Sequence, residues 1–199
     1  MNKRKLRIGV LFGGKSSEHD VSLVSARSVM AAIDKSRYDV VPIGIDREGH
    51  WLLGGDPMRQ LTAGAYSSPV PDEQLALVAA TPRVDFAFLT SDAALESTGD
   101  APSPIAPAVD IIFPVLHGPM GEDGTVQGLL DLVNVPYVGC GVLASAVGMD
   151  KLICKAVLAA HQLPQAPYVG VLRQRWETEP ESVLAWLEAQ LPYPMFVKP

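Results

Sequence analysis

The sequence predicts an α/β protein built around a parallel sheet. Three apolar runs, Leu6–Phe12, Tyr38–Ile45 and Val109–Leu116, are nearly continuous, as strands buried on both faces of a sheet are. Two of these runs end in glycine-rich turns, Gly13–Asp20 and His117–Gly124, and each turn leads into a segment with helical spacing of apolar residues. Strand, turn and helix in this order favour an open α/β sheet, in which ligands bind at the carboxyl ends of strands.

The first helix follows the turn after Leu6–Phe12. Its apolar residues recur at helical spacing, at Leu23, Ala26, Met30 and Ile33. We therefore expect a helix that begins near Glu18 and ends at Asp34.

The second strand, Tyr38–Ile45, ends at a turn after which His50–Leu53 is predicted to pair back as a short strand. From residue 54 to residue 108 the composition shifts to Pro, Ala, Ser and Thr, with one strand-like run at Val84–Leu89. We interpret residues 54–108 as a peripheral insertion without obvious chemistry.

The third strand, Val109–Leu116, leads through the second glycine turn into a helix with an apolar stripe over Val126–Val133. A short strand at Pro136–Val138 and a short helix at Val142–Gly148 follow. These elements complete a predicted N-terminal domain of residues 1–149.

Residues 150–199 are predicted to begin a second domain. Its expected elements are a helix at Asp150–His161, a strand at Tyr168–Leu172, a helix at Pro180–Gln190 and a strand starting at Met195–Val197. The sequence stops as that last strand opens, which is typical of a domain that has only started.

The composition argues against several classes of function. The 199-residue chain has a net charge of -6 and a pI near 5.1, so nucleic acid is not expected as a partner. The two cysteines, Cys140 and Cys154, are too few for a disulfide framework and are typical of free thiols in a cytosolic protein. The basic N-terminus lacks a signal-peptide cleavage pattern, and Leu6–Phe12 is too short to span a membrane.

The stretch Gly9–Ser16, GVLFGGKS, matches the phosphate-binding loop of P-loop NTPases. In such a site Lys15 would bind phosphate and Ser16 would bind magnesium. Three of the four middle positions continue the apolar strand instead, and the acids Glu18 and Asp20 would repel a phosphate. We favour the strand and keep the phosphate loop as the weaker alternative.

Glu18 and His117 converge if the two glycine turns lie side by side at the carboxyl edge of the sheet. A carboxylate beside a helix start suits a ligand ammonium, and the amides of the helix start suit a ligand carboxylate, so together they suit an amino acid. Structural alternatives are a helix-start acid at Glu18, a backbone-bonded histidine at His117 and a helix cap at Asp123.

Two lysines are further candidates. A cation at the start of a helix is disfavoured by the helix dipole, so Lys151 indicates a bound anion nearby. Lys198 ends the apolar run Phe196–Lys198, where it is either an edge residue whose ammonium reaches solvent or a phosphate contact.

Gly13–Ala26 (GGKSSEHDVSLVSA) and His117–Lys151 (HGPMGEDGTVQG…PYVGCGVLASAVGMDK) closely resemble the two N-terminal signatures of the D-alanine–D-alanine ligase family. The resemblance covers essentially the whole chain. It includes Gly44–Trp51 (GIDREGHW), found in members with an insertion, and Pro194–Pro199 (PMFVKP), where the family's ATP-grasp domain begins. The resemblance implies a Rossmann-like preATP-grasp domain followed by the start of an ATP-grasp domain.

The resemblance further implies a cytoplasmic, homodimeric ligase that uses ATP with Mg²⁺ or Mn²⁺ to make a peptidoglycan precursor. The carboxylate of a first D-alanine attacks the γ-phosphate of ATP, and the amine of a second D-alanine displaces phosphate from the acyl phosphate. Phosphorylation makes the carboxylate electrophilic, and the charge of phosphoryl transfer needs cationic groups.

By motif position, Glu18 corresponds to the acid that holds the ammonium of the first D-alanine, Val21 to a residue lining that pocket, and His117 to the adjacent histidine. Glu18 and His117 are therefore the candidate catalytic residues. Lys151 and Lys198 correspond to lysines that contact ATP. The family's metal ligands and lid fall beyond residue 199. A D-alanine–D-lactate ligase and a non-catalytic amino-acid-binding fragment are the alternatives.

Overall fold

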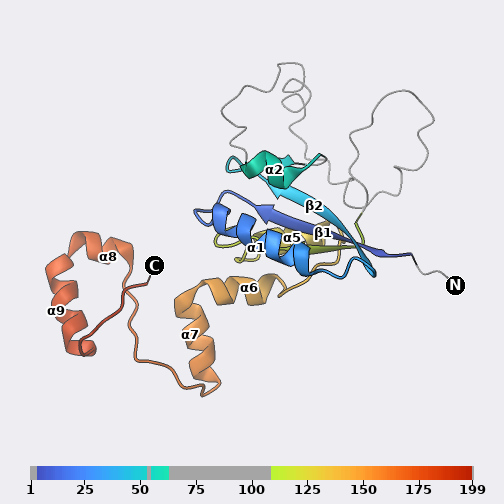
Figure 1. Cartoon of the computed structure of the whole chain (residues 1–199). Coiled ribbons are helices and arrows are strands. Elements are labelled where there is room, and N and C mark those ends of the chain that lie inside the picture. Colours follow the sequence, from blue (N-terminus) through green and yellow to red (C-terminus); the bar gives the residue numbers. More distant parts are fainter. Residues whose placement is uncertain (1–3, 53–54, 63–108, 199) are drawn as a thin grey trace. The chain divides into compact units, whose positions relative to one another are not determined.

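The computed structural model describes residues 4–52, 55–62 and 109–198. The chain divides into two compact units, residues 1–149 and residues 150–199 (Figure 1). The candidate residues Glu18, Val21 and His117 belong to the first unit, and Lys151 and Lys198 belong to the second.

The first unit contains, within the described residues, a four-stranded sheet in the order β3-β2-β1-β4. The central strand β1 (Leu6–Gly13) pairs in parallel with β2 (Tyr38–Ile45) on one side and β4 (Ile111–Pro114) on the other. The edge strand β3 (Trp51–Leu52) pairs antiparallel with β2. The predicted α/β class and the three neighbouring parallel strands are therefore confirmed.

β4 is shorter than the predicted run over residues 109–116. Its ladder with β1 joins Ile8–Leu11 to Ile111–Pro114. Pro114 lacks an N–H group. The amide of the next residue, Val115, still donates to the carbonyl of Leu11, and beyond it the chain enters the second glycine turn.

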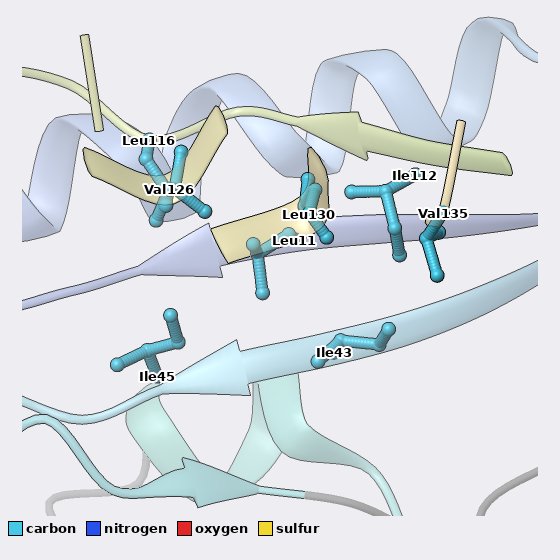
Figure 2. Close-up of a cluster of buried hydrophobic side chains, with 8 residues drawn as sticks. All are labelled: Leu11, Ile43, Ile45, Ile112, Leu116, Val126, Leu130 and Val135. Atoms are coloured by element: carbon cyan, nitrogen blue, oxygen red, sulfur yellow. The ribbon is translucent and has the colours of Figure 1, made fainter. Parts of the chain in front are cut away.

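A helix packs on each face of the parallel strands. α1 (His19–Ala32) packs through Leu23 and Ala26 on one face, against β1 residues that include Phe12. The opposite face carries a cluster in which α5 (Thr125–Leu132) is packed against β1, β2 and β4 (Figure 2). Its members are Leu11, Ile43, Ile45, Ile112, Leu116, Val126, Leu130 and Val135. Successive β1 residues thus enter opposite layers, which explains the continuous apolar run.

The β2–β3 connection is the predicted hairpin. The carboxylate of Asp46, which is 1% exposed, accepts hydrogen bonds from the backbone amide of His50 at 2.8 Å and from its ring Nδ1 at 2.9 Å. After β3, the short helix α2 (Pro57–Thr62) was not predicted. The remainder of the predicted insertion, including Val84–Leu89, lies outside the described residues.

Pro136–Val138 extends the sheet by one isolated parallel bridge rather than by a full strand. The bridge pairs Tyr137 with Ile112, whose amide donates to Pro136 and whose carbonyl accepts from Val138. The first unit ends with α6 (Val142–Met149), one residue longer than predicted.

The second unit contains α7 (Lys151–Ala160), α8 (Arg173–Thr178) and α9 (Pro180–Gln190). The strands predicted at Tyr168–Leu172 and Met195–Val197 are wrong, since both segments are without regular structure. A strand needs a neighbouring strand for its backbone hydrogen bonds, and the described part of this unit offers none. None of the helices in the described residues is long and apolar enough to cross a membrane.

Candidate functional site

The first glycine turn leaves the sheet at the carboxyl end of β1. Residues 9–12 are strand residues paired with β2, so the phosphate-loop alternative for Gly9–Ser16 is wrong. Gly13 and Gly14 both have φ of +94°, which favours glycine, and the amide of Gly14 donates to the carbonyl of Ile45. The turn therefore begins at Gly13, the last residue of β1, and not within residues 9–12.

Three polar residues, Glu18 at the N-cap of α1 and Ser22 and Ser25 within the helix, face the segment from Val115 to Gly118. Glu18, Ser22 and Ser25 follow one another at i, i+4 and i+7, so their side chains lie along one stripe. Ser22 is fully buried, and its hydroxyl accepts from the amide of Gly13 at 2.8 Å and donates to the carbonyl of Val115. This one side chain ties the helix to the ends of both β1 and β4.

The ends of the stripe reach residues 117 and 118. Ser25 Oγ lies 2.9 Å from Nε2 of His117, which is half-buried. Glu18 Oε2 lies 2.6 Å from the position that a Cβ atom on Gly118 would occupy, and Ser16 Oγ lies 2.7 Å from it. The structure thus brings the Glu18 carboxylate against the backbone of the residue that follows His117.

The two acids of the second turn accept hydrogen bonds from backbone amides in or next to the same turn. Glu122 accepts from the amide of Gly118 at 2.7 Å, and Asp123 accepts from the amides of Met120 and Thr125 at 2.9 and 3.0 Å. Burial acts to raise the pKa of Asp123, but these hydrogen bonds outweigh it, so its pKa lies below the usual 3.8. Asp123 therefore has a structural role in the turn, although the N-cap residue of α5 is Gly124 and not Asp123 as the helix-cap alternative expected.

Two pockets flank His117 in the described part of the first unit. One, of about 280 Å³, is lined by both glycine turns and by apolar side chains that include Trp51 and Leu129. The other, of about 660 Å³, is lined by Ser25, Glu122 and residues of α5 and α6. Glu18 and Val21 line neither pocket; both are exposed beside them on α1.

The two candidate lysines are exposed on the second unit. Lys151 begins α7 directly after Asp150, whose carboxylate accepts from the amides of Leu152 and Ile153 at 3.0 and 2.9 Å. This carboxylate offsets the positive helix end, so the position of Lys151 has a structural explanation beside the anion-binding one. Lys198 lies in an irregular segment.

Sequence reasoning missed several residues at this site. Lys15, which the sequence suggested only within the phosphate-loop alternative, lines the smaller pocket, and its aliphatic stem lies over Gly49 in the β2–β3 turn. His19 is 3% exposed, and its Nδ1 lies 2.8 Å from the carbonyl oxygen of Gly14. Ser22 and Ser25 were missed as well, although their spacing from Glu18 in EHDVSLVS was a usable signal.

Among the described residues, the one group of acids and histidines close enough to share a metal ion is Asp46, Glu48 and His50. It does not fit Mg²⁺, which prefers oxygen ligands, because it includes an imidazole and its buried carboxylate already binds His50 twice. This turn is therefore not assigned as a magnesium site.

Fold and site together define a class: an α/β protein with a pocket where two glycine turns meet at the carboxyl edge of a parallel sheet, which is where ligands bind in such sheets. The chain belongs to the family described as D-ala D-ala ligase N-terminus, whose model matches residues 7–140.

Relatives agree with this assignment. The D-alanine–D-alanine ligase of Heliobacterium modesticaldum is 48% identical over 195 residues, covering 98% of this chain and 50% of the relative. That of Geobacillus thermodenitrificans is 46% identical over 195 residues, with the same coverage. The chain spans about half the length of the curated relatives it matches.

Two solved structures share the fold. The VanG D-Ala:D-Ser ligase from Enterococcus faecalis matches with a TM-score of 0.65 and 31% identity, over 98% of this chain and 52% of that chain. The D-alanine–D-alanine ligase from Coxiella burnetii matches with a TM-score of 0.60 and 32% identity, over 94% and 49%.

Proposed function

We propose that this chain forms the N-terminal half of an ATP-dependent D-alanine–D-alanine ligase and supplies its site for the first D-alanine. The observation that carries the proposal is the meeting of Glu18 with the His117–Gly118 segment at the carboxyl edge of the sheet, in a chain of the ligase family. We use the term full-length ligase for the protein in which these residues are joined to the remaining half.

Glu18 is proposed to bind the ammonium group of the first D-alanine. Its carboxylate is exposed beside the start of α1, and it forms no hydrogen bond or ion pair within the described part of the chain. An ammonium placed there would gain a charge-assisted hydrogen bond, which is roughly twice as strong as a neutral one. Val21, one turn along the helix and 53% exposed, would line the same space.

His117 is proposed to lie beside the reacting carboxylate of that D-alanine. Attack of this carboxylate on the γ-phosphate of ATP forms an acyl phosphate and releases ADP. The amine of the second substrate then attacks the acyl carbon, and phosphate leaves. Negative charge accumulates during the transfer, so donors fixed near the carboxylate stabilise the transition state.

Lys151 and Lys198 are proposed to contact the phosphates of ATP, with Mg²⁺ or Mn²⁺ entering together with the nucleotide. The support is their position in the family motifs and their exposure on the second unit. A homodimeric, cytoplasmic enzyme of peptidoglycan synthesis is part of the same proposal. Sedimentation of the full-length ligase tests the dimer.

The second substrate is proposed to be D-alanine. The relatives at 46–48% identity are named D-alanine–D-alanine ligases, whereas the D-Ala:D-Ser ligase is 31% identical. Supplying D-alanine, D-serine or D-lactate beside labelled D-alanine, and separating the products, identifies the partner. The proposal of D-alanine fails if a D-serine or D-lactate product dominates at equal concentrations.

The experiment that tests the proposed site compares Glu18→Gln with Asp20→Asn in the full-length ligase. Asp20 is also an exposed acid at the start of α1, but its carboxylate lies 2.8 Å from the guanidinium of Arg47. Replacing a charged hydrogen bond by a neutral one costs about 1–2 kcal/mol. We expect kcat/KM for the first D-alanine to fall roughly 5- to 30-fold only in Glu18→Gln, with KM for ATP unchanged.

If Glu18 is only a helix-start acid, the glutamine variant loses a few tenths of a kcal/mol of stability and keeps its kinetics. A thermal melt recorded beside the kinetics separates the two outcomes. Unchanged D-alanine kinetics with a slightly lower Tm would leave Glu18 without a role in binding.

A further inference from the structure

Ser25 makes an unusual contact for a serine within a helix. Helical serines commonly return their hydroxyl to a carbonyl of the preceding turn, as Ser28 does, donating to Val24 at 3.2 Å. Ser25 instead reaches out of its helix, and its Oγ lies 2.9 Å from Nε2 of His117, 92 positions along the chain. A contact between elements so far apart in sequence holds two parts of the site together.

We propose that Ser25 is a positioning residue that fixes the imidazole of His117 for the reaction of the first D-alanine; this inference rests on the proposed function. An imidazole has two distinct nitrogens, and a partner at one of them sets the orientation of the other. With Nε2 held by Ser25, Nδ1 is the nitrogen that remains for a bound substrate.

A serine hydroxyl suits this task because it both donates and accepts hydrogen bonds. It can donate to Nε2 when that nitrogen is bare and accept from it when that nitrogen carries a proton. The contact therefore survives a change of proton at His117. A fixed donor such as a lysine ammonium would repel the protonated ring.

The surrounding structure fixes the distance between the two side chains. Ser22, on the same face of α1 and one turn before Ser25, bonds both Gly13 and the carbonyl of Val115, two residues before His117. Ser22 is fully buried, so water does not compete for these bonds. The helix carrying Ser25 and the strand end leading to His117 are thus locked together, as a positioned catalytic group requires.

The test uses Ser25→Ala, Ser25→Thr as the variant that keeps the hydroxyl, and Ser28→Ala as the matched control on the same helix. Ring-nitrogen NMR of the chain labelled with ¹⁵N-histidine reports the state of His117, distinguished from the other three histidines by a His117→Gln sample. Steady-state kinetics of the same variants in the full-length ligase measure how the change at His117 affects kcat and KM.

We expect Ser25→Ala to shift the His117 ring signals and to lower kcat roughly 2- to 12-fold, with KM for ATP unchanged, as for one hydrogen bond lost in the transition state. Ser25→Thr should restore both the signals and kcat. Ser28→Ala should match the parent in both measurements.

Parent-like His117 signals in Ser25→Ala overturn the proposal, and so does a parent-like kcat. A lower Tm with unchanged kcat likewise reduces Ser25 to a packing residue. If instead the parent ligase forms no dipeptide, the proposed function fails, while the NMR comparison still decides whether Ser25 orients the ring.

Discussion

Replacing Gly118 by alanine should damage the site in a way that the structure quantifies. Gly118 has φ of +73°, and the added Cβ would lie 2.6 Å from Glu18 Oε2 and 2.7 Å from Ser16 Oγ. Left-handed backbone at a non-glycine residue costs roughly 1–2 kcal/mol. The contact distances are shorter than real Cβ atoms tolerate, so the flexible Glu18 carboxylate must move.

Two consequences are expected for Gly118→Ala. The strain should lower Tm by roughly 2–8 °C, given about 2–4 °C per kcal/mol for a protein of this size. The displaced carboxylate should weaken the proposed contact of Glu18 with the substrate ammonium and lower kcat/KM for the first D-alanine roughly 5- to 30-fold. Melting curves of the 199-residue chain measure the first effect, and steady-state kinetics of the full-length ligase measure the second.

Gly55→Ala is the matched control for the strain alone. Gly55 has a similar φ of +66°, and its added Cβ would also meet the end of a flexible side chain, Nε2 of Gln60 at 2.9 Å. This variant should lose similar stability and keep the D-alanine kinetics. If Gly118→Ala also keeps parent-like D-alanine kinetics, the idea that Gly118 leaves room for the Glu18 carboxylate is refuted.

Two further predictions concern stability. Burial acts to raise the pKa of Asp110, but hydrogen bonds from the amide of Arg7 and the guanidinium of Arg4 outweigh this effect. The pKa of Asp110 in the folded state therefore lies below 3.8. The stabilisation by Asp110 is present above the pKa of this group in the unfolded chain and is lost as the pH falls through its pKa in the folded protein. Asp110→Asn should therefore lower the free energy of unfolding by about 1–2 kcal/mol at pH 7 and by less near pH 2. Urea titrations at the two pH values measure this difference. Leu130 is fully buried, so Leu130→Ala should lower the free energy of unfolding by about 2–5 kcal/mol. Leu132 is 87% exposed, so Leu132→Ala should lower it by less than about 1 kcal/mol. Equal losses for the two variants in chemical denaturation would contradict the assigned core.

The sheet could be predicted because its strands are buried on both faces. β1 and β2 begin at the predicted residues, since continuous apolar runs leave few alternatives. Tyr168–Leu172 shows the limit of this rule: it has strand-like composition, but composition does not state whether a neighbouring strand exists. α8 (Arg173–Thr178) was missed for the opposite reason, because a short, polar and exposed helix has no apolar stripe to reveal it.

The site could be predicted only as far as the two turns. Motif and topology together indicated that Glu18 and His117 lie at one edge of the sheet. The contact of Ser25 with His117 could not be derived, because it depends on the rotation of α1 about its own axis. That rotation is set by Ser22, whose hydroxyl bonds both strand ends, and by the apolar residues on the same helix.

The structure adds a physical reason for the motif-based proposal that Glu18 binds the ligand ammonium. The two turns contain four acids, Glu18, Asp20, Glu122 and Asp123, and without the family motif the sequence does not separate an acid that binds a ligand from one that shapes a turn. Three of them have partners within the protein: Asp20 pairs with Arg47, and the two acids of the second turn accept backbone amides. A carboxylate that already accepts backbone amides of its own turn has less capacity to bind an ammonium, and its removal would leave those amides without their acceptor. Among the four acids, Glu18 is the one whose carboxylate makes no ion pair and accepts no backbone amide within the described part of the chain. It lies against Gly118, where the start of α1 and the second turn meet.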